Sequence, residues 1–165
     1  MNPQPEKNGA DEGFQDPLEN YEPKSYDDPL QEALAEQTVA AIQSRPYAGV
    51  PPETTIEDAV GKLAGLHVAC LLVEREGTLL GVFSHRDVLD RVGLEYESIK
   101  QQPVSTVMTS NPIYVYETDS AAAALAVMAA AGYRHVPVLD LDDRLVGIVS
   151  PQRVTDFLEQ NMRKG

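Results

Sequence analysis

The residues of this chain that are best suited to bind a ligand lie in one short stretch, Ser84-His85-Arg86-Asp87. A serine hydroxyl and the unpaired backbone amides that begin a helix are good donors to phosphate. The Asp87 carboxylate can accept hydrogen bonds from ribose hydroxyls, and Gly81 lets a ligand approach the backbone closely. The Ser-x-x-Asp spacing is also a common helix-capping pattern. The stretch alone therefore fits either a capped helix or a nucleotide site.

The sequence around these residues occurs twice. Leu79–Val88 is matched 66 residues later by Leu145–Val154, with Gly81 aligned to Gly147 and the apolar positions conserved in type. Self-similarity at a fixed spacing is typical of a duplicated supersecondary unit. We therefore expect two copies of one fold, each with a strand that ends at a serine and turns into a helix.

The two copies differ in chemistry at one position. Arg153 stands where the first copy has Asp87. Arginine has donors and no acceptor, so it cannot hold the two hydroxyls of a ribose as a carboxylate can. We expect one competent sugar site, at Asp87, and one altered site, at Arg153, that binds an anion differently or stays empty.

Catalysis and metal binding are weaker interpretations. His85, Asp87 and His135 are acid–base types and Cys70 is a candidate nucleophile, but Cys70 lies in an apolar run where buried, inert thiols are common. No nucleophile–base–orienter set is evident. His67 and Cys70, three apart on a strand, point to opposite faces and cannot easily share an ion. We expect neither an enzyme nor a metal site.

The elements that position these residues follow from hydrophobic periodicity, caps and turns. A leading helix is predicted from Asp28 to about Gln43. The first copy reads as strands at 47–50, 68–73 and 78–83, a helix capped by Thr54 or Thr55, and a second helix that buries Val88, Leu89 and Val92. The second copy reads as strands at 113–116, 135–139 and 145–149, a helix capped by Asp119 or Ser120, and a final helix that buries Val154, Phe157 and Leu158.

Each copy is therefore β-α-β-β-α, and the fold class is α+β: small mixed sheets with helices packed on one face. Units of roughly 60 residues have marginal cores, so the copies are expected to pack together. The predicted organisation is an acidic, disordered tail at 1–28, a first repeat with its leading helix at 29–94, and a second repeat at 95–165. Removal of residues 1–27 is expected to leave stability nearly unchanged.

Composition excludes several classes of partner. A formal net charge of −13 and a pI near 4.5 disfavour nucleic acids and anionic membranes. The single cysteine excludes an intrachain disulfide. The sequence contains neither a signal peptide nor an apolar run approaching the roughly 18 residues of a membrane span. We expect a cytoplasmic protein.

The repeats resemble a known family. Gly81-Val82-Phe83-Ser84-His85-Arg86-Asp87 fits the glycine–apolar–x–Ser/Thr–x–x–Asp nucleotide motif of cystathionine-β-synthase (CBS) domains, Tyr133–Val138 fits their middle strand, and Val107-Met108-Thr109 fits the segment between repeats. The chain therefore resembles a tandem CBS pair, or Bateman module, over about residues 39–162. This resemblance implies a regulatory role, an adenosine-containing ligand such as AMP, ATP or S-adenosylmethionine, no cofactor, and a homodimer that acts on another protein in trans.

The resemblance also implies the site residues. One cleft between the repeats would be formed by Gly81, Val82, Phe83, Ser84, Arg86, Asp87, Asn111, Pro112, Ile113, Arg134, His135, Val136 and Pro137. In it Ser84 would donate to phosphate, Asp87 would take the ribose, and Ile113 and Val136 would enclose adenine. A second, altered cleft would join Tyr47, Val68, Ala69, Ser150 and Arg153. The alternative is a ligand-free dimerisation or docking scaffold. If the first cleft is a ligand site, Asp87→Ala should abolish ribonucleotide binding and leave the fold intact.

Overall fold

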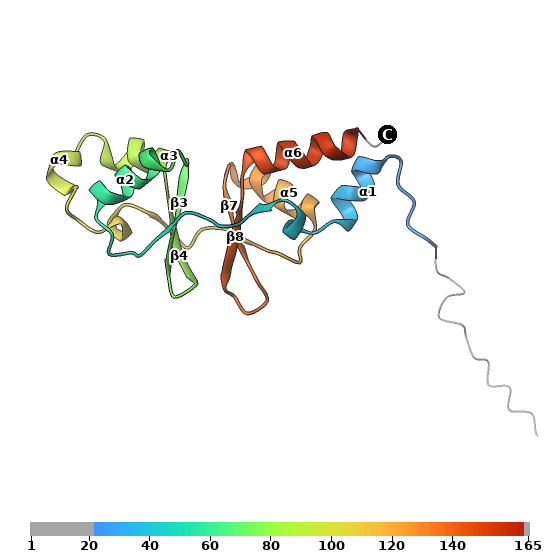
Figure 1. Ribbon diagram of the computed structural model, residues 1–165, viewed down its shortest axis with the longest axis horizontal. Helices are drawn as coiled ribbons and strands as arrows, with labels where there is room; N and C mark the ends of the chain where they lie inside the picture. Colours follow the sequence, from blue (N-terminus) through green and yellow to red (C-terminus); the bar gives the residue numbers. More distant parts are fainter. Residues whose placement is uncertain (1–21, 164–165) are drawn as a thin grey trace, which may run out of the picture.

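The computed structural model describes residues 22–163 and shows two α+β halves side by side. Each half contains a four-stranded mixed sheet, with strand orders β2-β3-β4-β5 and β1-β8-β7-β6. In the view of Figure 1 the two sheets lie at the centre, with α2 and α4 on the outer side of the first and α5 and α1 on the outer side of the second. The predicted fold class is confirmed. The acidic residues 1–21 of the expected tail lie outside the described part of the chain.

The first half follows the predicted order. It comprises β2 (Gly49–Val50), α2 (Ile56–Gly65), β3 (Cys70–Arg75), β4 (Thr78–Ser84), α3 (His85–Asp87) and a π-helical turn, Val88–Val92. Thr55 caps α2, since its hydroxyl accepts from the Asp58 amide at 3.1 Å. One burial prediction is wrong: Leu89 is 78% exposed, because the π-helical turn rotates it away from the core that Val92 enters.

The second half repeats this order. It comprises β6 (Val115–Tyr116), α5 (Ala121–Ala131), β7 (Val136–Leu139), β8 (Leu145–Val149) and α6 (Pro151–Met162). Ser120 caps α5, and Gly132 ends it in the left-handed conformation at φ 67°, which glycine adopts without a Cβ clash. The connector between the halves forms the short helix α4 (Tyr96–Ile99) and a 3₁₀ turn at Val104–Thr106.

The two halves exchange their first strands. β1 (Gln43–Ser44), near the start of the first repeat, pairs with β8 of the second half, while β5 (Thr109–Ser110), near the start of the second repeat, pairs with β4 of the first. Helix α1 (Pro29–Glu36) also packs on the second half, against α5 and α6. The leading helix that sequence order groups with the first repeat therefore stabilises the second.

The predicted leading helix is too long. Asp28 caps it as expected, accepting from the Gln31 amide at 2.8 Å, but α1 ends at Glu36 instead of Gln43. The chain then bonds to another segment, because the Val39 and Ala40 amides donate to carbonyls of residues 119 and 117 instead of continuing the helix. A 3₁₀ turn over 39–41 and strand β1 follow. Tertiary hydrogen bonds thus replace the helical ones.

Three apolar clusters hold the molecule together. One lies in each half, and the third joins them, with Cys70 and Leu72 of β3 packed against Leu139 and Leu145 of the second half. Hairpins β3–β4 and β7–β8 are accordingly side by side at the centre of Figure 1. The expectation that the copies share an interface is met by this third cluster. Within residues 22–163, no helix has both the length and the apolar character required to cross a bilayer.

The strand exchange predicts an unusual mutational effect. Ile42 precedes β1 and is fully buried in the core of the second half. Ile42→Ala should therefore lower the free energy of unfolding by about 2–5 kcal/mol through lost burial and a residual cavity. Urea denaturation measures the loss, and hydrogen exchange of β7 and β8 locates it in the second half. Leu141→Ala, at a 74% exposed position, is the control and should change stability little. Loss of protection confined to β3 and β4 would contradict this assignment.

Candidate functional site

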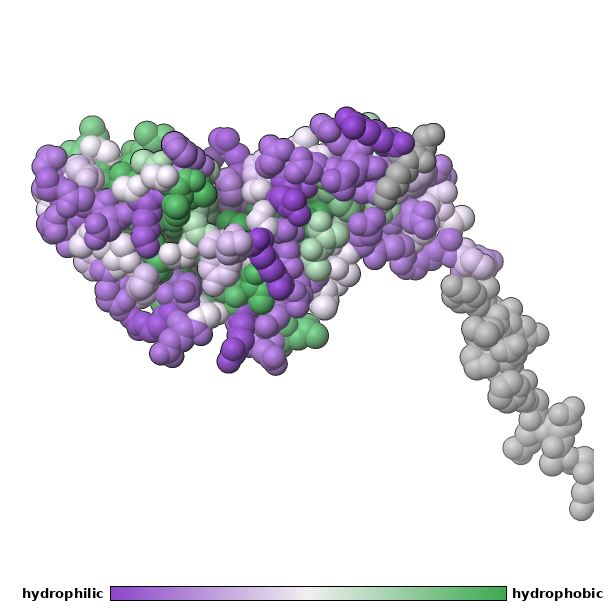
Figure 2. All heavy atoms as spheres, in the orientation of Figure 1, coloured by the Kyte–Doolittle hydropathy of each residue, from purple (hydrophilic) through white to green (hydrophobic). Residues whose placement is uncertain are grey.

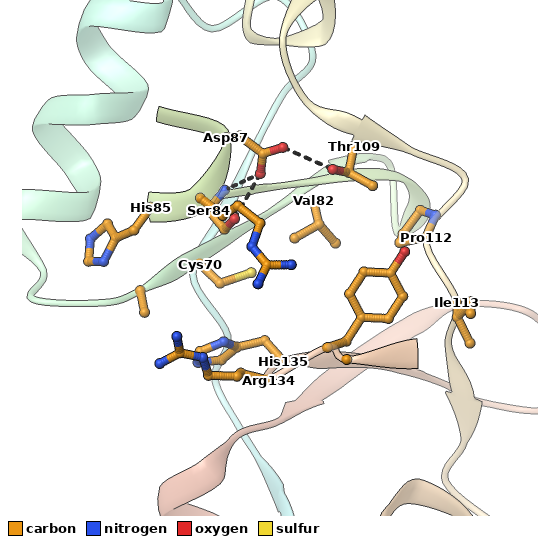
Figure 3. A pocket seen from close by; sticks show the side chains of 14 residues that line it. Cys70, Val82, Ser84, His85, Asp87, Thr109, Pro112, Ile113, Arg134 and His135 are labelled. Carbon is orange, nitrogen blue, oxygen red and sulfur yellow. Dashed lines mark hydrogen bonds between the residues drawn. The ribbon is translucent and has the colours of Figure 1, made fainter. Parts of the chain in front are cut away.

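A cavity of about 270 Å³ lies between the two halves (Figure 3). Its walls come from β3, β4, α3 and β5 of the first half and from segments 112–113 and 132–135 of the second. Eight of the residues predicted for the first cleft line it: Val82, Ser84, Arg86, Asp87, Pro112, Ile113, Arg134 and His135. The volume is close to the lower end of the range of about 300–1,000 Å³ for small-molecule sites.

Five predicted residues do not line the cavity. Phe83 lies between Val82 and Ser84 on β4, so its side chain points to the opposite face and is buried in the first core. Val136 belongs to the second core and is fully buried, and Pro137 is buried within β7. The expected enclosure of adenine between Ile113 and Val136 is therefore not formed. Asn111 precedes Pro112 in the left-handed region, at φ 48°.

Gly81 serves the fold, not the cavity. A Cβ at this position would clash with Met108 Sδ and would lie 2.9 Å from the Thr109 carbonyl oxygen. The close approach that requires glycine is therefore that of β5, which pairs with β4 through Gly81 and Ser110. Gly81 was predicted to make room for a ligand, but in the structure it makes room for the neighbouring strand β5.

The structure adds six residues that were not predicted for this cleft. Ala69, Cys70, His85, Thr109, Gly132 and Tyr133 also line the cavity. Cys70 and His135 occupy equivalent positions in the two repeats. Cys70 precedes the core residue Leu71, which pairs with Phe83 of β4. His135 likewise precedes the core residue Val136, which pairs with Val149 of β8. The internal repeat could therefore have indicated that Cys70 and His135 approach one cavity from opposite halves.

Asp87 is held by its neighbours. Its Oδ2 accepts from both the amide and the hydroxyl of Ser84 at 2.8 Å, and its Oδ1 accepts from the Thr109 hydroxyl at 2.9 Å (Figure 3). Arg91 Nη1 lies 3.6 Å from Oδ1 and donates to the Val107 and Met108 carbonyls. Asp87 is 5% exposed. Ser84-x-x-Asp87 therefore caps the helix and also borders the cavity, so the capping interpretation and the ligand-site interpretation are compatible.

The charged groups at the cavity are mainly positive. Among residues 22–163, the guanidinium groups of Arg86 and Arg134 form no ion pair or hydrogen bond. Asp87 is the one carboxylate among the described lining residues, and Arg91 offsets its charge. In a chain of net charge −13, two unpaired guanidinium groups in one cavity favour an anionic occupant.

Two further groups have shifted pKa values. Burial raises the pKa of the Cys70 thiol to about 12, with a smaller contribution from the Asp87 charge. The thiol is therefore protonated at neutral pH, which does not suit a nucleophile. Burial also lowers the pKa of His135, and the nearby Arg134 and His85 lower it further. Among the described residues, no cluster of three His, Cys, Asp or Glu side chains could hold a metal ion.

The residues predicted for the second cleft are divided between different cavities and clusters. Arg153 lines a separate groove with Gln43, Ser44 and Arg45, and Ser150 caps α6. The exchanged strand β1 brings these residues beside Arg153 because it pairs with β8. The other predicted members lie elsewhere: Tyr47 in the cluster between the halves, Val68 against the first core, and Ala69 in the first cavity.

The fold and the cavity define a class of protein in which two α+β repeats enclose a common cavity. The sequence pattern of the CBS domain matches residues 39–93 and 104–160, and the chain belongs to the CBS-domain family. It is 37% identical over 106 residues to the CBS domain-containing protein CBSCBSPB3 of Arabidopsis thaliana, covering 64% of this chain and 19% of that protein. The chain thus spans about a fifth of the length of the curated relatives it matches.

Solved structures show the same architecture. The CBS-domain containing protein ATU1752 from Agrobacterium tumefaciens is 30% identical with a TM-score of 0.62, covering 68% of this chain and 90% of that one. Arabidopsis thaliana CBSX2 in complex with AMP is 26% identical with a TM-score of 0.67, covering 75% of this chain and 97% of that one.

Proposed function

We propose that this chain is a non-catalytic regulatory module that binds an adenosine-containing ligand in the cavity between its repeats. The observation that carries the proposal is the combination, in one cavity, of the buried Asp87 carboxylate, an apolar wall and the guanidinium groups of Arg86 and Arg134, which have no partner within residues 22–163. These are the partners that ribose, adenine and phosphate require. The AMP complex of CBSX2, which has the same fold, supports this ligand class.

The cavity suggests a role for each group. Asp87 Oδ2 has both lone pairs occupied by Ser84, whereas Oδ1 accepts one hydrogen bond, from Thr109, and retains capacity for a ribose hydroxyl. Ile113 is 46% exposed, and with Val82 and Pro112 it offers an apolar surface for adenine. The Ser84 hydroxyl, expected to bind phosphate, instead donates to Asp87. The guanidinium groups of Arg86 and Arg134 bind the phosphate instead.

We infer the regulatory role from membership of the CBS-domain family. A module that binds a nucleotide between two halves can alter their packing and so signal to a protein partner. We place this activity in the cytoplasm. The strongly acidic chain makes nucleic acid an unsuitable partner.

The proposal is tested by thermal unfolding and calorimetry with AMP, ATP, S-adenosylmethionine and adenosine. A ligand present at 100 times its Kd stabilises the native state by about 2.7 kcal/mol, which raises the melting temperature measurably. We expect a rise with at least one adenine nucleotide and a 1:1 stoichiometry per chain, since the second copy has Arg153 in place of the ribose-binding Asp87. The absence of a shift with every adenosine compound would reject the proposal.

One surface supports the second candidate, a dimerisation scaffold. Leu66, Leu89 and Leu94 are exposed, Leu94 fully, near the helices of the first half. Apolar (green) side chains gather over these helices in Figure 2, whereas α6 is largely hydrophilic. Large apolar side chains gathered on one exposed face are typical of protein–protein contacts. We propose that a second copy covers it. Light scattering should report a dimer for the native chain and a monomer for the Leu89→Asp, Leu94→Asp double variant.

A further inference from the structure

We propose that the cavity selects its ligand by negative charge and that the binding of a phosphorylated ligand is coupled to proton uptake by His135. The inference rests on the proposed function and narrows its ligand class to adenine nucleotides with a 5′-phosphate. It excludes S-adenosylmethionine, whose sulfonium and ammonium groups make it a net cation. It also makes the affinity of the module sensitive to pH near neutrality.

The geometry brings four basic side chains to one cavity from opposite halves. His85 and Arg86 begin the helix after β4, and Arg134 and His135 precede β7. Figure 3 shows His135 and Arg134 on the wall opposite Asp87, with His85 at the side of the cavity. The two pairs, His85-Arg86 and Arg134-His135, are far apart in sequence, so only the packing of the two halves creates this cluster.

Charged and titratable groups face His135 from every adjoining element. Helix α3 contributes His85, Arg86 and Asp87, β3 contributes Cys70, and its own segment contributes Tyr133 and Arg134. The Cys70 thiol is uncharged at neutral pH, and the Asp87 carboxylate is engaged with Ser84, Thr109 and Arg91. The cations therefore dominate the field at His135.

The positive charges near His135 keep its imidazole neutral when no anion is bound. Burial, Arg134 and His85 lower the pKa of His135 below its usual value near 6.5, so the group is neutral at pH 7 in the free protein. A bound phosphate reverses the local field and favours the imidazolium, so binding raises this pKa and a proton is taken up. Affinity is therefore enhanced at pH values below the pKa of the complex and loses this enhancement as the pH rises through it.

The experiment compares the native chain with His135→Gln by calorimetry with AMP between pH 5.5 and 8. The phosphate of AMP titrates in the same range, with a second pKa of about 6 for a phosphate monoester, but this effect cancels in the ratio of the two Kd values at each pH. The ratio of the variant to the native Kd should rise at least about threefold from pH 8 to pH 5.5, since each unit of pKa shift is worth tenfold in affinity. With adenosine the ratio should stay constant.

The chain provides a matched control. Of its three histidines, His67 lies outside the cavity, in the left-handed conformation at φ 52°, which asparagine tolerates. His67→Asn should reproduce the native pH profile with AMP. If His135→Gln fails to fold, AMP binding to the native chain in two buffers of different ionisation enthalpy measures proton uptake directly. The uptake should exceed that expected from the phosphate alone.

The outcomes separate this inference from the proposed function. AMP binding with a flat Kd ratio and no excess proton uptake overturns the coupling and leaves the proposed function standing. S-adenosylmethionine binding as tightly as AMP overturns the charge selection in the same way, because we expect it to be weaker by at least about tenfold beside two guanidinium groups. Failure of every adenosine compound to bind overturns both.

Discussion

Replacement of Arg86 and Arg134 together by glutamine should weaken AMP binding at least about 100-fold. Each charge-assisted hydrogen bond to phosphate is worth about 1.5–3 kcal/mol, and about 1.4 kcal/mol corresponds to tenfold in affinity. Because neither guanidinium group has a partner among residues 22–163, its removal leaves no carboxylate unpaired. Stability should change by less than about 0.5 kcal/mol. Calorimetry gives the affinity and urea denaturation the stability.

Arg144→Gln is the matched control for this loss. Arg144 is exposed in the turn between β7 and β8, away from the cavity, and its guanidinium group is likewise unpaired among the described residues. Its removal changes the net charge of the chain without touching the proposed site, so AMP affinity should be retained. Adenosine should bind the double variant and the native chain alike. Equal loss of adenosine and AMP binding would show that the two arginines shape the cavity instead of binding phosphate.

Asp87→Ala should cause the largest loss of stability of any substitution at the cavity, about 2–4 kcal/mol. The carboxylate accepts three hydrogen bonds, two from Ser84 and one from Thr109, and Arg91 approaches it. Its removal leaves the Ser84 amide without its side-chain acceptor and breaks the Thr109 hydrogen bond between β5 and α3. The structure therefore adds a loss of stability to the expectation that this variant keeps its fold. Urea denaturation measures the difference.

The binding role of Asp87 requires a milder variant. Asp87→Asn retains the shape and one carbonyl acceptor, so it should lose less stability than alanine while still weakening the hydrogen bond to ribose. Comparison of adenosine with 2′,3′-dideoxyadenosine then isolates this interaction. The native chain should prefer adenosine, and the asparagine variant should show a smaller preference. An unchanged preference would restrict Asp87 to a structural role.

The sequence by itself determined the repeat, the α+β class and the elements with strong local patterns. The predicted strand 145–149 coincides with β8, and Asp28, Thr55 and Ser120 cap helices as expected. Apolar periodicity and capping depend on neighbours within a few residues, so they can be read directly from the chain. The stretch Ser84–Asp87 was indicated for the same reason, because its four residues form one helix start.

Only the tertiary structure decided which half each segment joins and which side chains meet in the cavity. Strand pairing places β1 on the second sheet and β5 on the first, and alternation along β4 turns Phe83 into the core between two cavity residues. Cys70 and His135 line one cavity, and the Thr109 hydroxyl donates to the Asp87 carboxylate, only because residues distant in sequence are brought into contact. Such contacts are selected by the free energy of packing two marginal halves together, which no local pattern encodes.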